Sequence, residues 1–225
     1  MLTKSLFIGA AVAAAIAVPA QAAVLVNAGF ETGDLAGWQA PDGNVNVVMS
    51  SDDYAYGSAF GRQFVAEEGA QFAELTAGDA DEYVTLSQSF TLTNAARISF
   101  SAAFLRFDEL SDNGDGTFAF NDDAYIRIYS ATTNALVFNS SVLALGDDYS
   151  TPWSAFTSGL LGSGDYVFEA GVRNADEGGP DFSSKLLVDN LSIAVPEPST
   201  WAMMLLGFGA LGGALRRRRA GLALA

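Results

Sequence analysis

The chain has 225 residues, of which 50% are hydrophobic, and it contains neither cysteine nor histidine. This length suits one domain with additional terminal segments. Without Cys and His the chain has no Ser-His-Asp triad, disulfide, zinc site or iron–sulfur cluster, so any metal is a hard cation held by oxygen. Residues 23–195 carry 6 basic and 25 acidic residues, a net charge of −19. Because so acidic a body repels phosphate, we expect no nucleic-acid partner.

The first 22 residues have the three parts of a secretory signal peptide. Lys4 supplies the positive charge, residues 6–18 form a short apolar run, and Ala20 and Ala22 make an Ala-x-Ala end. We therefore expect signal peptidase to cut after Ala22 and the protein to be exported. The alternative is an anchor that is retained, but a spanning helix prefers about 20 apolar residues and this run is shorter.

The body, residues 23–195, shows the period-two alternation of β-strands and no long helical pattern. In residues 84–92, apolar side chains alternate with serine and threonine. Further strands are expected at residues 45–49, 71–75, 98–104, 124–128, 135–140, 153–158, 166–172 and 186–193. Turn residues such as Asp42-Gly43-Asn44 separate these segments. The pattern predicts a mainly β fold, an antiparallel β-sandwich.

An acidic stretch interrupts the strands between residues 107 and 123. Asp112, Asn113 and Asp115 carry the oxygen ligands that calcium takes, which makes them one candidate metal site. The Asp-x-Asp-x-Asp-Gly register of a helical calcium loop is absent. A solvated acidic hairpin is the alternative interpretation.

Two motifs at the ends of the body indicate a more specific fold. The first runs from Asn27 to Trp38, as Asn-x-Gly-Phe-Glu-x-Gly-x-x-x-Gly-Trp, and the second is Val188-Asp189-Asn190-Leu191-Ser192. Together they resemble the galactose-binding-like jelly rolls, which include many carbohydrate-binding modules. The resemblance implies that the first and last strands pair and that a structural Ca²⁺ lies beside them, bound by Glu31 and Asp189. The alternative is that both are ordinary strand-end carboxylates.

The C-terminal end has three parts. Pro196, Glu197 and Pro198 precede an uncharged apolar segment, residues 199–215, and the cluster Arg216, Arg217, Arg218 and Arg219 follows. A short transmembrane helix with its arginines in the cytoplasm is expected from this order. The alternative is a plain tail anchor.

This end resembles the PEP-CTERM sorting signal, whose segment is also catalogued as an ice-binding-protein C-terminal domain. The resemblance implies exosortase processing after a transient stay in the inner membrane, then delivery to the outer surface or matrix of a bacterium that makes exopolysaccharide. Residues 220–225 form a short tail that such signals usually lack.

Sugar binding by exposed aromatic rings is the function expected of the body. The candidates are Tyr54, Tyr56 and Trp153, with Tyr149 less favoured, whereas Trp38 ends a motif and is expected in the core. No pair of carboxylates is singled out for glycoside hydrolysis, so we expect no enzymatic activity. We thus expect a glycan-binding envelope or matrix protein associated with exopolysaccharide or biofilm. The alternative is a structural adhesion protein without a defined sugar site.

Overall fold

A computed structural model describes residues 25–53, 61–79, 81–107, 111–115, 118–146, 148–175, 183–195 and 206–212. The chain divides into two compact units. Residues 22–196 form the body, and residues 1–21 with 197–225 form the other unit. The signal-peptide alanines, the Pro-Glu-Pro element and the arginine cluster lie outside the described residues.

Residues 206–212 form a short helix inside the segment expected to cross the membrane, residues 199–215. Across the described ranges, no helix is both long enough and apolar enough to span a bilayer. The rest of that segment lies outside the described residues.

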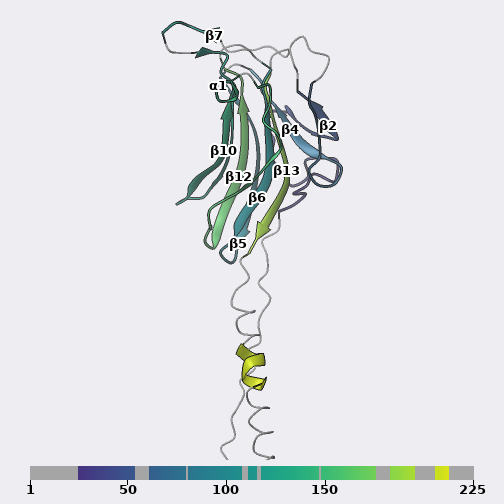
Figure 1. Cartoon of the computed structure of the whole chain (residues 1–225), viewed down its shortest axis with the longest axis vertical. Helices are drawn as coiled ribbons and strands as arrows, with labels where there is room; N and C mark the ends of the chain where they lie inside the picture. The colour runs from purple at the N-terminus through teal and green to yellow at the C-terminus, as the bar shows by residue number, and fades with distance from the viewer. Residues whose placement is uncertain are drawn as a thin grey trace, which may run out of the picture. The chain divides into compact units, whose positions relative to one another are not determined.

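The body is a sandwich of two antiparallel sheets, seen face to face in Figure 1. The five-stranded sheet has the order β1-β4-β13-β6-β11, with bounds Val45–Val48, Phe72–Thr76, Lys185–Ala194, Arg97–Leu105 and Ser154–Thr157. The four-stranded sheet has the order β10-β9-β12-β5, with bounds Asn134–Ser141, Asp123–Tyr129, Gly164–Arg173 and Tyr83–Leu92. The predicted antiparallel sandwich is confirmed, because each strand expected from the alternation occurs, with its ends shifted by at most two residues.

The main core lies between the two sheets and is built from the apolar set of each alternating strand. On β5 the buried apolar residues are Val84, Leu86, Phe90 and Leu92. Trp38 is 8% exposed and packs against Phe30 and Phe168, with ring centroids 5.1 and 5.9 Å away, so its expected place in the core is confirmed. Burial of such large rings is the main favourable contribution to folding in a chain without disulfides.

Four short strands and one helical turn were missed by the sequence analysis, since each is too short to show a period. The β2–β3 hairpin, Ser50–Asp52 with Gln63–Val65, covers the outer side of the five-stranded sheet. A second apolar cluster lies there, made of Phe64, Phe72, Ala103, Leu105 and Leu187. The β7–β8 hairpin, Ser111–Asp112 with Phe118–Ala119, and helix α1, Val142–Leu145, lie together at one end of the sandwich (Figure 1).

The first strand that the resemblance places beside the last one, expected around Val24, lies outside the described residues. The two neighbours of β13 are β4 and β6, and residues 25–38 form successive turns. Asn27 and Phe30 have positive φ angles of 50° and 58°, which a continuous strand excludes. A hydrogen bond from Leu191 N to Ala28 O at 3.3 Å joins this segment to β13. The turns place Phe30 in the core, where it is fully buried.

Candidate functional site

The outer side of the four-stranded sheet carries aromatic and charged side chains in register, and we call this surface the tyrosine face. Successive side chains of a strand point to opposite sides, so the residues between the core positions point outward. Pairing between β9 and β12 sets Asp123 opposite Arg173, Tyr125 opposite Gly171, and Arg127 opposite Glu169. Tyr83 of β5 is in turn opposite Arg173. The face therefore joins residues about 40 to 90 positions apart in the chain.

Glu169 is the centre of a hydrogen-bond network on this face. Its Oε1 accepts from Tyr125 Oη at 2.7 Å and from Arg127 Nε at 2.9 Å, and Arg127 Nη2 lies 2.6 Å away. Its Oε2 accepts from Tyr129 Oη at 3.1 Å. The Arg127 guanidinium also lies over both tyrosine rings, 5.3 and 4.8 Å from their centroids. One carboxylate thus holds three side chains in place through charge-assisted bonds.

Asp123 organises a second group on the same face. Its Oδ1 accepts from Arg173 Nε at 2.7 Å, and Tyr83 Oη donates to its Oδ2. Arg173 lies over the Tyr83 ring at 5.2 Å, and the rings of Tyr83 and Tyr125 meet edge to face at 5.0 Å. The Tyr83–Tyr125 contact connects the two networks.

The tyrosine hydroxyl groups on the face remain protonated. Burial, followed by the hydrogen bond to Asp123, raises the pKa of Tyr83 to about 12. Burial and the neighbouring Glu169 carboxylate also raise the pKa values of Tyr125 and Tyr129. Each hydroxyl therefore donates to a carboxylate at neutral pH, which fixes the orientation of its ring.

Gly171 is required for this arrangement because it lies beneath the Tyr125 ring. A Cβ atom at position 171 would stand 2.6 Å from Tyr125 Cε1 and 2.9 Å from its hydroxyl oxygen. Such distances are far below van der Waals contact, so any larger residue displaces the ring.

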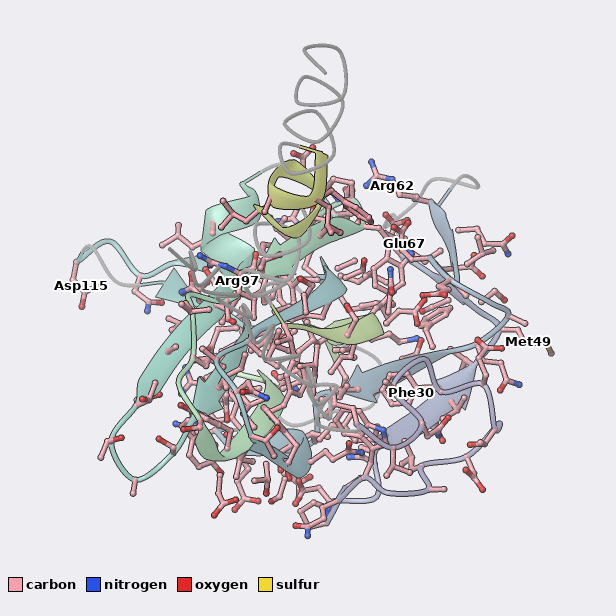
Figure 2. The ribbon with its side chains drawn as sticks, turned by 90° about the horizontal axis from the view of Figure 1, so that it is seen from below. Phe30, Met49, Arg62, Glu67, Arg97 and Asp115 are labelled. Atoms are coloured by element: carbon pink, nitrogen blue, oxygen red, sulfur yellow. The ribbon has the colours of Figure 1, made fainter. Side chains whose placement is uncertain are left out.

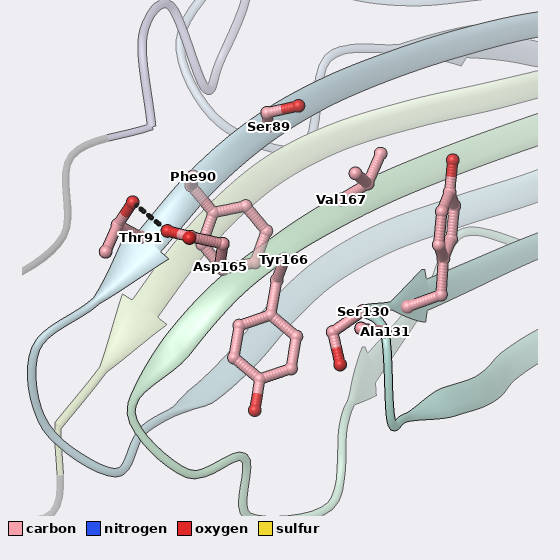
Figure 3. Close-up of a pocket in the computed structure, with 9 residues that line it drawn as sticks. Ser89, Phe90, Thr91, Ser130, Ala131, Asp165, Tyr166 and Val167 are labelled. Atoms are coloured by element: carbon pink, nitrogen blue, oxygen red, sulfur yellow. Dashed lines mark hydrogen bonds between the residues drawn. The ribbon is translucent and has the colours of Figure 1, made fainter.

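Two hollows open along the face. The first, about 310 Å³, lies over β9 and β10 and is lined by Tyr83, Asp123, Ala124, Tyr125, Arg127, Asn134, Leu136 and Asn139. The second, about 550 Å³, lies where β5 and β9 end and β12 begins (Figure 3). It is lined by Ser89, Phe90, Thr91, Tyr129, Ser130, Ala131, Asp165, Tyr166 and Val167. Tyr129 therefore belongs both to the Glu169 network and to the second hollow.

The aromatic residues proposed from the sequence lie elsewhere. Tyr54 and Tyr56 are outside the described residues. Trp153 is half-buried on the five-stranded sheet, where its ring meets Phe72 at 5.5 Å and its Nε1 donates to Val65 O at 2.9 Å. The Tyr149 ring lies under the Arg106 guanidinium at 4.9 Å. These contacts engage Trp153 and Tyr149 in packing.

The two carboxylates expected to hold calcium converge on one loop, residues 67–71. Glu31 Oε1 accepts from Ala70 N and Gln71 N at 2.9 and 3.1 Å. Asp189 is fully buried, and its Oδ2 accepts from Glu67 N and Glu68 N at 2.8 and 3.1 Å. Burial and, to a smaller degree, the Glu31 charge raise the pKa of Asp189.

The other candidate metal residues, Asp112, Asn113 and Asp115, lie in and after β7, in the β7–β8 hairpin. Figure 2 places Asp115 at the edge of the body, on the side opposite Glu67, so the two candidate metal sites are separate. No group of three or more acidic side chains that could hold an ion is present in the parts of the chain that the structure describes.

The sequence analysis missed the tyrosine face, although part of its signal was present. The alternation that identified Ala124, Ile126 and Ile128 as core also places Asp123, Tyr125, Arg127 and Tyr129 outside. Two arginines and three tyrosines at outward positions of adjacent strands indicate a candidate binding surface. Finding it required knowing that β5, β9 and β12 are neighbours.

The sequence profile of the PEP-CTERM protein-sorting motif matches residues 194–219. This motif implies an exported protein that an exosortase processes. A comparison with curated proteins finds no match.

Among solved structures, the chain is similar to TmCBM61 in complex with beta-1,4-galactotriose, with a TM-score of 0.45 and 14% identity over 76% of this chain and 97% of that one. It is also similar to a Family 16 Carbohydrate Binding Module-2, with a TM-score of 0.42 and 15% identity over 76% and 98% of the two chains. The K3 cleaved adhesin domain of Lys-gingipain from Porphyromonas gingivalis W83 has the same four values.

Proposed function

We propose that this exported protein binds a glycan on its tyrosine face and associates with exopolysaccharide or biofilm outside the cell. The observation that carries the proposal is the set of three oriented tyrosines, held by Glu169 and Asp123 beside two hollows. Sugars are held by aromatic rings together with a few fixed polar groups, and this face offers both.

The proposed binding needs no catalytic step. Glu169 and Asp123 are the carboxylates central to the face, and each is bound by an arginine and by at least one tyrosine hydroxyl. In glycoside hydrolysis, one carboxyl group must donate a proton and another must attack or activate water. Carboxylates engaged in this way serve to position side chains, and we therefore propose a non-catalytic binding protein.

The proposed route to the surface rests on the two terminal segments of the chain. We propose that signal peptidase removes residues 1–22 and that residues 199–215 anchor the precursor in the inner membrane until exosortase acts. The match to the sorting motif over residues 194–219 supports this route. The motif begins at Ala194, the last residue of β13, so the processing signal directly follows the folded body.

A structural Ca²⁺ at Glu31 and Asp189 is a further part of the proposal. Both carboxylates are bound by the loop of residues 67–71, and their like charges oppose each other. Carboxylate oxygens fit a hard cation, and a cation beside them would relieve the repulsion. The ion would tie the turns after residue 25 to β13.

A glycan array probed with the purified protein tests the binding function, with Gly171→Ala as the disrupting variant. The added methyl group displaces the Tyr125 ring, so we expect binding to weaken by about tenfold or more, or about 1.4 kcal/mol. The control is Gly162→Ala, because a Cβ there meets nothing within 4 Å.

Selective binding that Gly171→Ala abolishes and Gly162→Ala retains supports the proposal. Binding that survives Gly171→Ala would place the sugar elsewhere, and Tyr54 and Tyr56 would then be replaced next. An array on which no glycan binds would favour the structural adhesion protein.

A further inference from the structure

The cations of the tyrosine face are already neutralised by the protein itself. Arg127 pairs with Glu169 at 2.6 Å, and Arg173 pairs with Asp123 at 2.7 Å. The two guanidinium groups are thus matched by two carboxylates. The four side chains are between 13% and 38% exposed. The centre of the face is therefore electrically balanced, although the body around it has a net charge of −19.

The other cations of the body lie away from this face. Lys185 pairs with Glu74 at 3.2 Å on the five-stranded sheet. Arg62 lies over Phe64 at 5.9 Å, and Arg97 donates to Ser158 O at 2.9 Å (both are labelled in Figure 2). Arg106, the last of the six, lies over Tyr149. Within the described residues, the face thus offers no unpaired cation to a carboxylate or sulfate group of a ligand.

We infer that the tyrosine face takes an uncharged polysaccharide and rejects polyuronates and other anionic chains. This inference rests on the proposed glycan binding and names the class of glycan. An anionic chain would meet the field of a strongly acidic protein without any free counter-charge, and that field acts over several kT at the surface. A neutral chain is not repelled by this field and needs no free cation on the face.

The remaining groups on the face suit hydroxyl-rich ligands. Asn134 and Asn139 line the first hollow, and Ser89 and Thr91 line the second. Amides and hydroxyls both donate and accept hydrogen bonds, as sugar hydroxyl groups do. Strand β9 is about 20 Å long from Asp123, which lines the first hollow, to Tyr129, which lines the second. A polysaccharide lying along β9 therefore contacts both hollows.

The test compares one polymer with and without charge. The neutral polysaccharide that the purified protein retains best in affinity electrophoresis is oxidised, so that its primary hydroxyl groups become carboxylates. Both forms are measured at about 50 and about 500 mM NaCl, because salt screens charge repulsion but hardly alters neutral contacts. We expect salt-independent retention of the neutral form and about tenfold weaker retention of the oxidised form at low salt, with a gap that narrows at high salt.

Two variants with the same change in charge separate the face from the net charge of the protein. Glu169→Gln keeps an acceptor for the tyrosines but releases Arg127, so the gap between the two polymer forms should narrow at low salt. Asp148→Asn changes an exposed residue just after α1 and should leave the gap unchanged.

Equal or stronger retention of the oxidised form, or a gap that salt does not alter, would overturn the inference while leaving glycan binding in place. The same holds if both variants narrow the gap equally. If neither class of polymer is retained, the proposed function itself fails. Circular dichroism of each variant shows that a loss is not caused by unfolding.

Discussion

Single carboxylates have sharply different roles in this protein, and their surroundings decide which. Glu169 is 13% exposed, beside an arginine and two tyrosines, and it organises a surface. Asp122, which directly precedes Asp123, is fully buried and accepts hydrogen bonds from the backbone amides of Ala175 and Ser184. Burial without a neighbouring cation disfavours the charged form of a carboxyl group and so raises its pKa.

Because Asp122 is buried, we expect the free energy of unfolding to depend on pH. Burial raises the pKa of Asp122 from 3.8 to about 6, against the opposing effect of its hydrogen bonds. Between about pH 4 and 6 the folded state holds a proton that the unfolded state has lost, so this group's contribution to the free energy of unfolding falls as pH rises. The full change is about 3 kcal/mol, complete once the pH exceeds the folded pKa.

The measurement is urea unfolding of wild type and Asp122→Asn at several pH values from 4 to 7. The variant lacks the titrating group, so its stability relative to wild type should improve by about 3 kcal/mol across that range, whatever its stability at pH 4. Asp148→Asn, at an exposed position, is the control. A difference that stays constant with pH would show that Asp122 does not titrate in this window.

At the scale of elements, the loop between β3 and β4 shows how a connection becomes part of a site. Gly69 has a φ of 70°, and a Cβ there would stand 2.2 Å from Glu31 Oε1. A glycine is therefore needed both for the backbone conformation and for the approach of the carboxylate. The loop's backbone amides also bind Asp189 on β13, so one loop connects the opening turns to the last strand.

Calcium should stabilise this junction. An ion that binds only the folded state adds about 2.7 kcal/mol at a hundredfold excess over Kd, which raises the Tm by several degrees. Magnesium should do much less, because it keeps its waters and prefers a tighter octahedral shell. Thermal melts with EDTA, calcium or magnesium measure the effect in wild type, Glu31→Gln and Asp189→Asn.

Glu68→Gln is the matched control for those melts, since Glu68 is an exposed carboxylate on the same loop. Equal shifts from both metals would indicate general screening of the acidic body. A calcium-specific shift that persists in Glu31→Gln and Asp189→Asn would place the ion elsewhere, with the hairpin of Asp112, Asn113 and Asp115 as the next candidate.

At the scale of the whole molecule, the sorting motif at residues 194–219 implies export and exosortase processing. We expect that replacing Pro196, Glu197 and Pro198 with alanine leaves full-length precursor in the inner membrane of a host that has an exosortase. Cell fractionation and immunoblotting check this, with Pro152→Ala, an exposed proline before β11, as the control. Processing of the triple variant at the wild-type rate would contradict the sorting prediction.

The sequence by itself determined the nine strands of the two main sheets, their buried sides and the sorting motif at the C-terminal end. Alternation along Val84 to Leu92 and Tyr166 to Val172 is a local property with a period of two, so it is readable without knowing any partner strand. Turns at Gly43 and Gly114, both at positive φ, are equally local. The sorting motif is also contained in one short segment.

Only the tertiary structure decided which outward residues meet. Tyr83, Asp123 and Arg173 are distant in the chain and become neighbours because β12 lies between β5 and β9. Likewise, Glu31 and Asp189 both accept hydrogen bonds from the loop of residues 67–71, which is distant from each of them in the chain. Strand order and register arise from the packing of the whole core, and the alternation within one strand carries no information about its neighbours.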